Sequence, residues 1–288
     1  MIHEIEAKTA LHFHRKTFAS NWDLNVYRGC GHGCAYCFAQ YSHRYLNTDC
    51  FFSDIFVKTN IAEALEAQLS KRSWTSHAIT IGGVSDSYQP IEKKYRLMSE
   101  VLRVMINHEN PTIITTKSTL ILRDLEILKE LSKVAEVYVG TSVSTLDEKT
   151  RKIVEPGATP AKDRLEMLGE FNKVGIKTSV LLMPIIPLIT DQKDNLEEIF
   201  RLCKKFNVNN MFASALHLRG NTKNKFFRFL ENKFPELIPK YKNLYNSSNV
   251  AKKYGSGLYG YLAMLRKKYQ IFDTYTKPKP VRKTRLFD

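Results

Sequence analysis

The chain has 288 residues, of which 43% are hydrophobic, and this is enough to bury the core of one barrel-sized domain. It contains no uninterrupted apolar run of about 18 residues, and its N-terminus lacks the apolar centre of a secretory signal, so we expect a soluble, cytoplasmic protein with no membrane partner. The net charge of +15 is uneven: residues 1–200 carry −1 and residues 201–288 carry +16. This basic end predicts a polyanionic partner.

Apolar, β-branched runs alternate with amphipathic stretches along the first 220 residues. The expected strands are Asp23–Tyr27, Ala78–Val84, Pro111–Thr116, Ala135–Val143, Ile176–Met183 and Asn210–Leu216. The expected helices include Ile61–Lys71, Thr119–Ser132, Pro160–Val174 and Asp191–Phe206. Strands and helices that alternate at a spacing of about 30 residues predict βαβ units and a parallel sheet. Six strands predict an α/β fold, a partial (β/α)6 barrel, with functional residues at the C-terminal strand ends.

The chain changes character at Asn221, where the strand rhythm stops and Lys, Phe, Tyr and Asn become frequent. We therefore expect a core at residues 1–220, with an N-terminal lead-in, and a basic, aromatic-rich helical extension at residues 221–288. Its last segment, Lys277–Asp288, reads KPKPVRKTRLFD, a mobile basic tail by composition.

The basic third also holds 15 of the 30 Phe and Tyr residues, as in KNKFFRFLENKF at Lys223–Phe234. Aromatic rings stack on bases while lysines neutralise phosphates, so this composition suits single-stranded or distorted nucleic acid. An amphipathic cap with its aromatic residues inward and its lysines in solvent explains the same pattern.

Three of the five cysteines, Cys30, Cys34 and Cys37, lie within eight residues in the segment NVYRGCGHGCAYCFAQ. An odd number at this close spacing does not suit a disulfide framework, but it suits a metal. The interspersed glycines let three thiolates converge on one iron-sulfur cluster, whose fourth iron stays open to an exogenous ligand. The alternative is a tetrahedral zinc site, with His32 or Cys50 as the fourth ligand.

The spacing CxxxCxxC resembles the signature of the radical S-adenosylmethionine (SAM) superfamily. Three further segments, GGVSDSYQPIE (Gly82–Glu92), TTKS (Thr115–Ser118) and VEPGATPAKDR (Val154–Arg164), are similar in content and order to the spore photoproduct lyase-like branch, also called DNA-repair-photolyase-like. The similarity covers residues 5–245. It implies a [4Fe-4S] cluster on the three cysteines and SAM on the open iron. Reductive cleavage of SAM then gives a 5′-deoxyadenosyl radical that abstracts hydrogen from the substrate.

The resemblance also implies cofactor contacts at the strand ends. The candidates for the amino end of SAM are Gly82, Gly83, Ser85 and Asp86, and the candidate for its carboxylate is Lys117. The candidates for its ribose are Ser142 and Ser144, and those for its adenine are Met183–Pro187. Tyr36 and Phe38 would shield the cluster and the adenine from water. Alternatively, Ser85 and Asp86 only cap a turn, and Lys117 only ends a strand.

Two positions depart from the branch pattern. Gly83 stands where spore photoproduct lyase has its hydrogen-donating cysteine, and Phe38 stands where a tyrosine is common. Either Cys50 or Cys203 could replace the thiol if the fold brings it close, but an unpaired cysteine is most often a buried apolar residue. Arg164 matches the branch arginine without an assigned role.

Other chemistry-bearing residues have ordinary explanations. His12, His14 and His43 lack the spacing of metal ligands. Glu155 and Pro156 lie in a loop that is explained by the start of the helix expected at Pro160.

Three functions remain open at this point. The first is a radical enzyme that acts on DNA or RNA. The second is a radical enzyme with a protein, peptide or small-molecule substrate, whose positive charge serves an electron donor such as flavodoxin or ferredoxin. The third is a non-catalytic, metal-containing nucleic-acid-binding protein.

Overall fold

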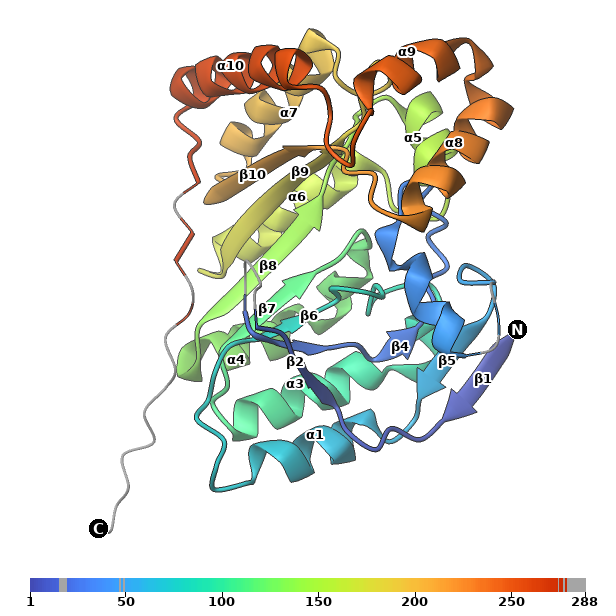
Figure 1. Ribbon diagram of the computed structural model, residues 1–288. Helices are drawn as coiled ribbons and strands as arrows, with labels where there is room; N and C mark the ends of the chain where they lie inside the picture. The colour runs from blue at the N-terminus through green and yellow to red at the C-terminus, as the bar shows by residue number, and fades with distance from the viewer. Residues whose placement is uncertain (16–19, 47, 49, 274, 277, 279–288) are drawn as a thin grey trace.

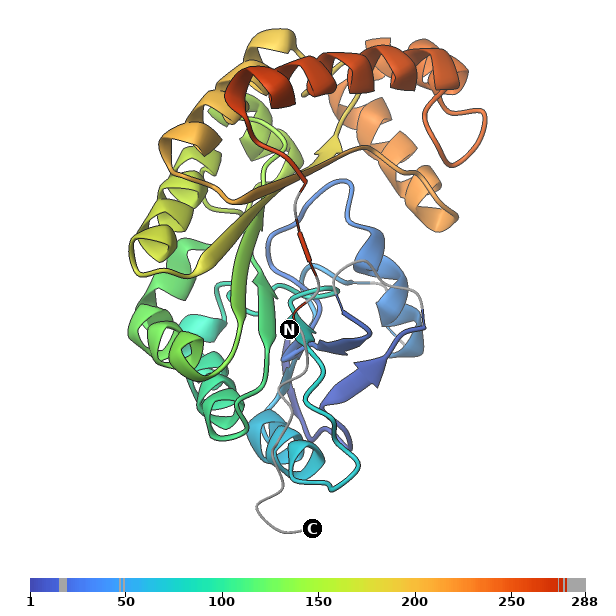
Figure 2. The same ribbon diagram turned by 90° about the vertical axis from the view of Figure 1, so that its left-hand side faces the viewer.

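A seven-stranded sheet forms the centre of the protein (Figure 1), seen in a computed structural model that describes residues 1–15, 20–46, 48, 50–273, 275, 276 and 278. Its order is β10-β9-β8-β7-β6-β3-β2. The strands are β2 (Leu11–Phe13), β3 (Trp22–Leu24), β6 (Ile79–Ile81), β7 (Thr112–Thr115), β8 (Val137–Ser142), β9 (Lys177–Ile185) and β10 (Asn210–Ala215). The six strands from β3 to β10 run parallel and β2 is antiparallel to β3. This confirms the predicted parallel α/β fold, and Figure 2 shows the strands as an open arc.

Helices cover the convex side of the arc (Figure 2). They are α1 (Ile61–Leu69), α3 (Leu97–Asn107), α4 (Leu125–Val134), α6 (Ala161–Lys173) and α7 (Lys193–Lys205), with the short α2 (Glu92–Tyr95), α5 (Glu148–Val154) and η2 (Thr119–Asp124) at strand ends. In α7, Leu196, Ile199, Phe200 and Cys203 recur at helical spacing and are buried in the core. The other face of the sheet is therefore free to line a cavity.

The predicted strand Asp23–Tyr27 is wrong in one respect, because it is two strands in different sheets. After β3, the chain bends at Asn25 and continues as β4 (Tyr27–Arg28), which pairs with β5 (Ile55–Lys58). The side-chain oxygen of Asn25 accepts hydrogen bonds from the backbone of Val84 and Ser85, which holds the bend. The small sheet is completed by β1 (Ile2–Ile5) beside β5.

The C-terminal extension is helical, as predicted: α8 (Asn221–Lys233), η3 (Pro235–Leu237), α9 (Ile238–Leu244) and α10 (Lys252–Tyr269). The aromatic residues Phe226, Tyr241 and Tyr245 are at most 1% exposed and form a second core that also contains Cys34 and Tyr36. The cap interpretation thus accounts for most aromatic residues of α8 and α9. The predicted tail, Lys277–Asp288, lies outside the described residues except for Pro278. In the described part of the chain, every helix is too short or too polar to cross a membrane.

Candidate active site

The three signature cysteines lie on one loop between β4 and the 3-10 helix η1 (Phe38–Tyr45). Cys34 is 7% exposed, and Cys30 and Cys37 are half-buried. Burial raises the pKa of each thiol, that of Cys30 to about 12, while Lys117 acts in the opposite direction at Cys34 and Cys37. Bare thiols here hold their protons at neutral pH, so thiolates need the charge of bound metal. Three buried sulfur donors on a short loop suit an iron-sulfur cluster.

The segment after β6 supports one side of the cysteine loop. Ser85 Oγ donates a hydrogen bond to the carbonyl of Gly29, and Gln89 Nε2 donates to the same oxygen at 3.1 Å. Gln89 Oε1 accepts from the backbone N–H of Gly31 at 2.8 Å. Gly29 has φ +83°, and a Cβ there would lie 2.4 Å from the carbonyl oxygen of Asp54. Only glycine fits where the loop enters.

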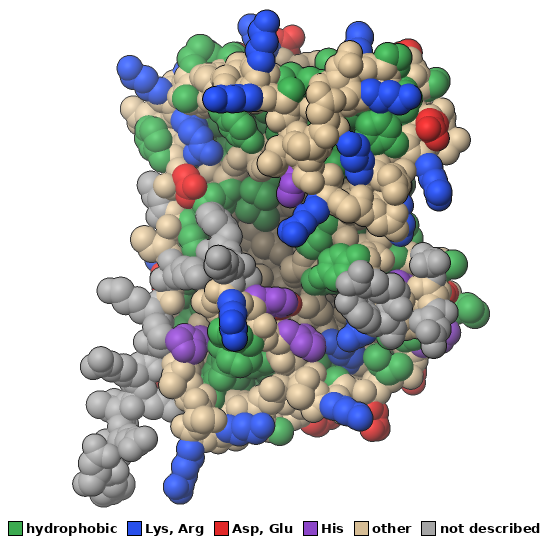
Figure 3. Space-filling model, in the orientation of Figure 1, with side chains coloured by type: hydrophobic (Ala, Val, Ile, Leu, Met, Phe, Trp, Pro, Cys, Tyr) green, Lys and Arg blue, Asp and Glu red, His purple; other side chains and the backbone are tan. Residues whose placement is uncertain are grey.

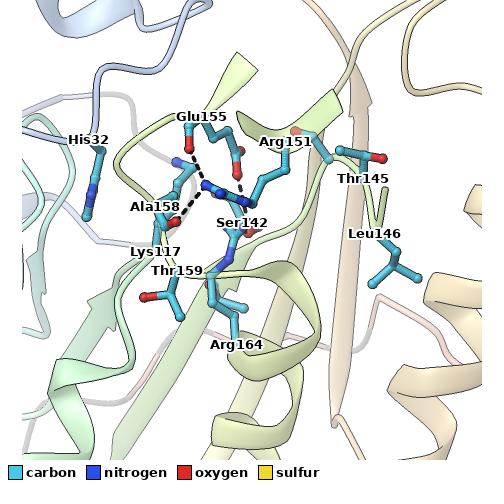
Figure 4. A network of polar contacts seen from close by, with 12 residues as sticks. His32, Lys117, Ser142, Thr145, Leu146, Arg151, Glu155, Ala158, Thr159 and Arg164 are labelled. Carbon is cyan, nitrogen blue, oxygen red and sulfur yellow. Dashed lines mark hydrogen bonds and ion pairs between the residues drawn. The ribbon is translucent and has the colours of Figure 1, made fainter. Parts of the chain in front are cut away.

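The VEPG loop, residues 154–157, holds the other side. The backbone N–H of Gly157 donates to the carbonyl of His32 at 2.9 Å, and that of Ala35 donates to the carbonyl of Val154 at 2.9 Å. Arg151 Nη1 in turn donates to the carbonyls of Glu155 and Ala158, at 2.7 and 2.8 Å (Figure 4). As predicted, the loop leads into a helix, α6. Its contacts with the cysteine loop are a second role that sequence reasoning missed.

A buried ion pair lies beneath these two loops. Arg164 Nη2 lies 2.7 Å from Glu155 Oε2, and the two side chains are 0% and 1% exposed. Arg164 also donates to the carbonyl of Ser142 (Figure 4). The hydroxyl of Tyr36 donates to Glu155. Burial opposes ionisation of Glu155, but Arg164 and then Lys117 outweigh it and lower the pKa of this carboxyl. This gives Arg164 a structural role, where the sequence had assigned none.

Lys117 follows β7 and lies close to the cysteines. Its Nζ is 5.8 Å from the centre of the Tyr36 ring. Burial alone lowers the pKa of Lys117, but the negative charges of Cys34 in its thiolate form and of Glu155 outweigh it and raise the pKa above its ordinary value. The ammonium is therefore charged and suits the carboxylate of SAM, which is the contact that the resemblance implies.

Asp86 has four partners within the protein. Its carboxylate accepts from the Thr116 hydroxyl at 2.7 Å, from the backbone of Tyr88 and Lys117 at 2.9 and 2.7 Å, and lies 3.0 Å from His32 Nε2. Burial opposes its ionisation, yet His32 and these hydrogen bonds lower its pKa to about 2. Asp86 and Ser85 both hold the cysteine loop in place, and their direct contact with SAM stays a prediction.

His32 does not suit the zinc alternative. Its Nδ1 lies 2.9 Å from the carbonyl oxygen of Gly157 and its Nε2 is taken by Asp86. Both ring nitrogens thus already have partners. Among the described residues, no group of three His, Cys, Asp or Glu side chains, the three cysteines included, is arranged to hold a single metal ion.

The remaining predicted cofactor residues lie at the same end of the sheet with different exposures. Tyr36 is 9% exposed and Phe38 is 58% exposed, so Tyr36 alone is enclosed in the second core. Ser144 Oγ donates to the carbonyl of Pro184 at 2.9 Å, which ties the end of β8 to the segment Met183–Pro187. Ser142 ends β8. Their contacts with the ribose and adenine stay predictions.

Neither spare cysteine lies in the cavity of the sheet. Cys203 is fully buried on α7, on the convex side, and Cys50 is exposed. The concave side has a cavity of about 510 Å³, lined by Thr115, Gly140 and Met183 from the strands and by Arg266 and Tyr275 from the C-terminal segment. Figure 3 looks into this side and shows a central hollow whose rim carries Lys, Arg and His side chains.

Adjacent glycines after β6 allow a matched test. A Cβ on Gly82, which has φ +90°, would lie 2.3 Å from the carbonyl oxygen of Thr115, whereas a Cβ on Gly83 meets no atom within 4 Å. We expect Gly82→Ala to lower the free energy of unfolding by about 1–3 kcal/mol. Gly83→Ala should stay within about 0.5 kcal/mol of the wild type. Urea unfolding of both variants measures this, and equal effects would contradict the strained turn.

Comparison with known proteins decides the family. The family model described as the radical SAM superfamily matches residues 24–225. The chain belongs to the radical SAM superfamily, and it is a radical SAM enzyme. The predicted superfamily is thereby confirmed, and the non-catalytic alternative is wrong. Membership in the radical SAM family implies an iron-sulfur cluster and SAM binding.

The chain is also similar to individual proteins and solved structures. The uncharacterized protein Rv2578c of Mycobacterium tuberculosis is 32% identical over 249 residues, covering 84% of this chain and 73% of that protein. A radical SAM Nalpha-GlyT isomerase of Pseudomonas phage M6 is 26% identical over 166 residues, covering 57% and 33%. A spore photoproduct lyase variant with bound AdoMet and dinucleoside spore photoproduct has a TM-score of 0.71 at 11% identity, covering 96% and 82%. This last similarity shows the fold.

Sequence reasoning missed several residues that shape this radical SAM site. Gln89 and Asn25 both lie inside the quoted segments, so their position next to the cysteines and glycines was a usable signal. Glu155 was interpreted only as part of a helix start. Nothing local in the sequence indicated that Arg151 would donate hydrogen bonds to the carbonyls of Glu155, Pro156 and Ala158.

Proposed function

We propose that this radical SAM enzyme binds a [4Fe-4S] cluster at Cys30, Cys34 and Cys37 and repairs or modifies DNA or RNA. The cluster and SAM, when bound, supply the reductive cleavage that starts radical chemistry. The observation that carries the choice of substrate is the hollow on the concave side of the sheet, whose rim carries Lys, Arg and His side chains.

The chain's own residues bind and protect the cofactors in this proposal. Lys117 offers its ammonium to the carboxylate of SAM. Tyr36 packs with Phe226 and Tyr241 of the extension, which keeps water from Cys34. Exclusion of water strengthens electrostatic contacts and prevents side reactions.

A groove beside the opening suits a single nucleic-acid strand. It is about 560 Å³ in volume, is lined by His217, Lys252 and Tyr259, and shares Ser214 with the main cavity. Tyr259 is 44% exposed and offers a ring for base stacking. The bound dinucleoside in the spore photoproduct lyase structure supports the same substrate class.

The reaction differs from thiol-dependent lesion repair. Gly83 stands in place of the hydrogen-donating cysteine, and among the described residues no cysteine lines the cavity. We therefore favour a reaction that needs no thiol at that position. An acidic electron donor such as flavodoxin or ferredoxin is the proposed reductant, because Lys225 of α8 lies within electrostatic range of Cys37.

Salt-dependent binding of a single-stranded oligonucleotide tests the substrate class. We expect Lys252→Glu to weaken binding for all sequences alike and to reduce the slope of log K against log salt by about 1, because one phosphate contact is lost. Lys162→Glu, the same charge change on the exposed face of α6, serves as the control and should leave the slope unchanged. Fluorescence anisotropy at several salt concentrations measures both. Salt-independent or undetectable binding by the wild type would contradict a nucleic-acid substrate.

A further inference from the structure

Basic side chains gather at the edge of the sheet that is formed by β2 and β3. Leu11 and Leu24 enter the core with the helices, so their neighbours His12 and Asp23 point to the concave side. Lys58, at the end of β5, reaches the carbonyl of Asn25 just after β3. A buried cation therefore lies next to the bend that follows β3.

The environment of Lys58 leaves its charge incompletely satisfied. The residue is 5% exposed, and its Nζ donates to the carbonyl of Asn25 at 2.6 Å. An ammonium has three donors, and within the described residues the other two have no acceptor. Burial and then the nearby Arg28 lower its pKa to about 8. A buried ammonium in such a place is unfavourable unless an anion joins it.

The carboxylate of this group makes its contacts with residues other than Lys58. Asp23 Oδ2 accepts a hydrogen bond from Asn25 Nδ2 at 2.9 Å, its Oδ1 lies against His14, and its charge only partly offsets the effects of burial and Arg28 on the pKa of Lys58. In the part of the chain that the structure describes, neither Lys58 nor Arg28 forms an ion pair. Lys58 and Arg28 are thus two cations beside one carboxylate, whereas burial and then Lys58 lower the pKa of His12 and favour its neutral form.

One residue connects Lys58 to the cofactor segment. The backbone oxygen of Asn25 holds the Lys58 ammonium, while the side-chain oxygen accepts from the backbone of Val84 and Ser85 at 3.0 and 3.2 Å. Gly83, which precedes them, borders open space. An anion at Lys58 would thus lie beside the segment expected to meet SAM.

We propose that Lys58 is the centre of an anion subsite that binds a backbone phosphate of the substrate strand next to the nucleotide that reacts. The inference rests on the proposed nucleic-acid substrate. A compact ammonium suits a phosphate as a point charge. Lys117 is separately available for the carboxylate of SAM, so the carboxylate and the phosphate would each have a cation of their own.

A methylphosphonate scan tests the subsite in the reconstituted enzyme. A single-stranded oligonucleotide is compared with copies in which one linkage at a time is made neutral. In the wild type, we expect that neutralising one particular linkage weakens binding by about tenfold or more. This is the usual loss when a hydrogen bond to a charged group is removed. In Lys58→Met that position-specific loss should disappear. Lys177→Met, at the other end of the strands where Lys177 pairs with Glu136, is the control and should keep it.

The outcomes separate this inference from the proposed function. If the wild type binds no oligonucleotide, the proposed function fails. If it binds and Lys58→Met gives the same scan as the wild type, the subsite fails alone. If the variant loses affinity for SAM instead, the anion is the cofactor's carboxylate and the inference is overturned. Thermal unfolding checks folding: Met fills the volume of a buried Lys without its charge, so its Tm should not fall.

Discussion

Cys34→Ala is expected to abolish iron and sulfide binding after anaerobic reconstitution. Cys34 is the most deeply buried of the three thiols and is enclosed by the aromatic residues of the extension, so no water or neighbouring side chain can replace its sulfur. A cuboid cluster held at two corners is not retained. Iron and sulfide analysis, the visible absorption of the cluster and formation of 5′-deoxyadenosine from SAM should all fall to background.

The other two cysteines provide matched controls. Cys50→Ser alters an exposed thiol, and Cys203→Ala alters a buried one on the convex side. Both variants should retain iron at the wild-type level, although Cys203→Ala leaves a small cavity in the core. Loss of iron in Cys50→Ser, or full iron in Cys34→Ala, would contradict the assignment of ligands.

Arg164→Met is expected to lower the free energy of unfolding by about 3–5 kcal/mol, because it leaves Glu155 as a buried charge without its main partner. The loss should depend on pH. In the wild type the pKa of Glu155 is lowered by folding, so its contribution is present above the unfolded value of about 4.3 and is lost as pH falls. The difference in the free energy of unfolding between the variant and the wild type should therefore become smaller at acidic pH. Urea unfolding at several pH values measures it.

An exposed ion pair on α7 is the control for this prediction. The solvent-exposed Arg201 pairs with Glu198 at 2.6 Å. Arg201→Met should lower the free energy of unfolding by less than about 1 kcal/mol. Replacing Arg164 and Glu155 together by apolar residues should lower the free energy of unfolding less than replacing Arg164 alone, since no buried charge remains. An Arg164→Met variant as stable as Arg201→Met would show that the pair is not a structural element of the site.

The parallel sheet could be predicted because its strands are buried on both faces. Val137–Ser142 and Lys177–Ile185 read as continuous β-branched or apolar runs, and the amphipathic stretch after each strand is a recognisable helix. The small strands β1, β2, β4 and β5 have two to four residues and are held by pairing with distant segments. Local pattern carries no such information, which is why Asp23–Tyr27 was interpreted as one strand.

The proposed cluster ligands can be predicted from local spacing, whereas the residues that support their loop cannot. Cys30, Cys34 and Cys37 lie on one short loop, so the sequence alone places them together. The contacts of Glu155 with Tyr36 and Arg164 join residues far apart in the chain, and only the fold brings them together. Lys58 gave no signal at all, because a lysine that ends a strand is ordinarily a solvent-exposed residue.

Metal analysis of the anaerobically isolated wild-type enzyme, followed by incubation with SAM and a reductant, tests the cluster site most directly. We predict about four irons and four sulfides per chain and formation of 5′-deoxyadenosine. One zinc per chain, with no cluster absorption and no 5′-deoxyadenosine, would contradict it.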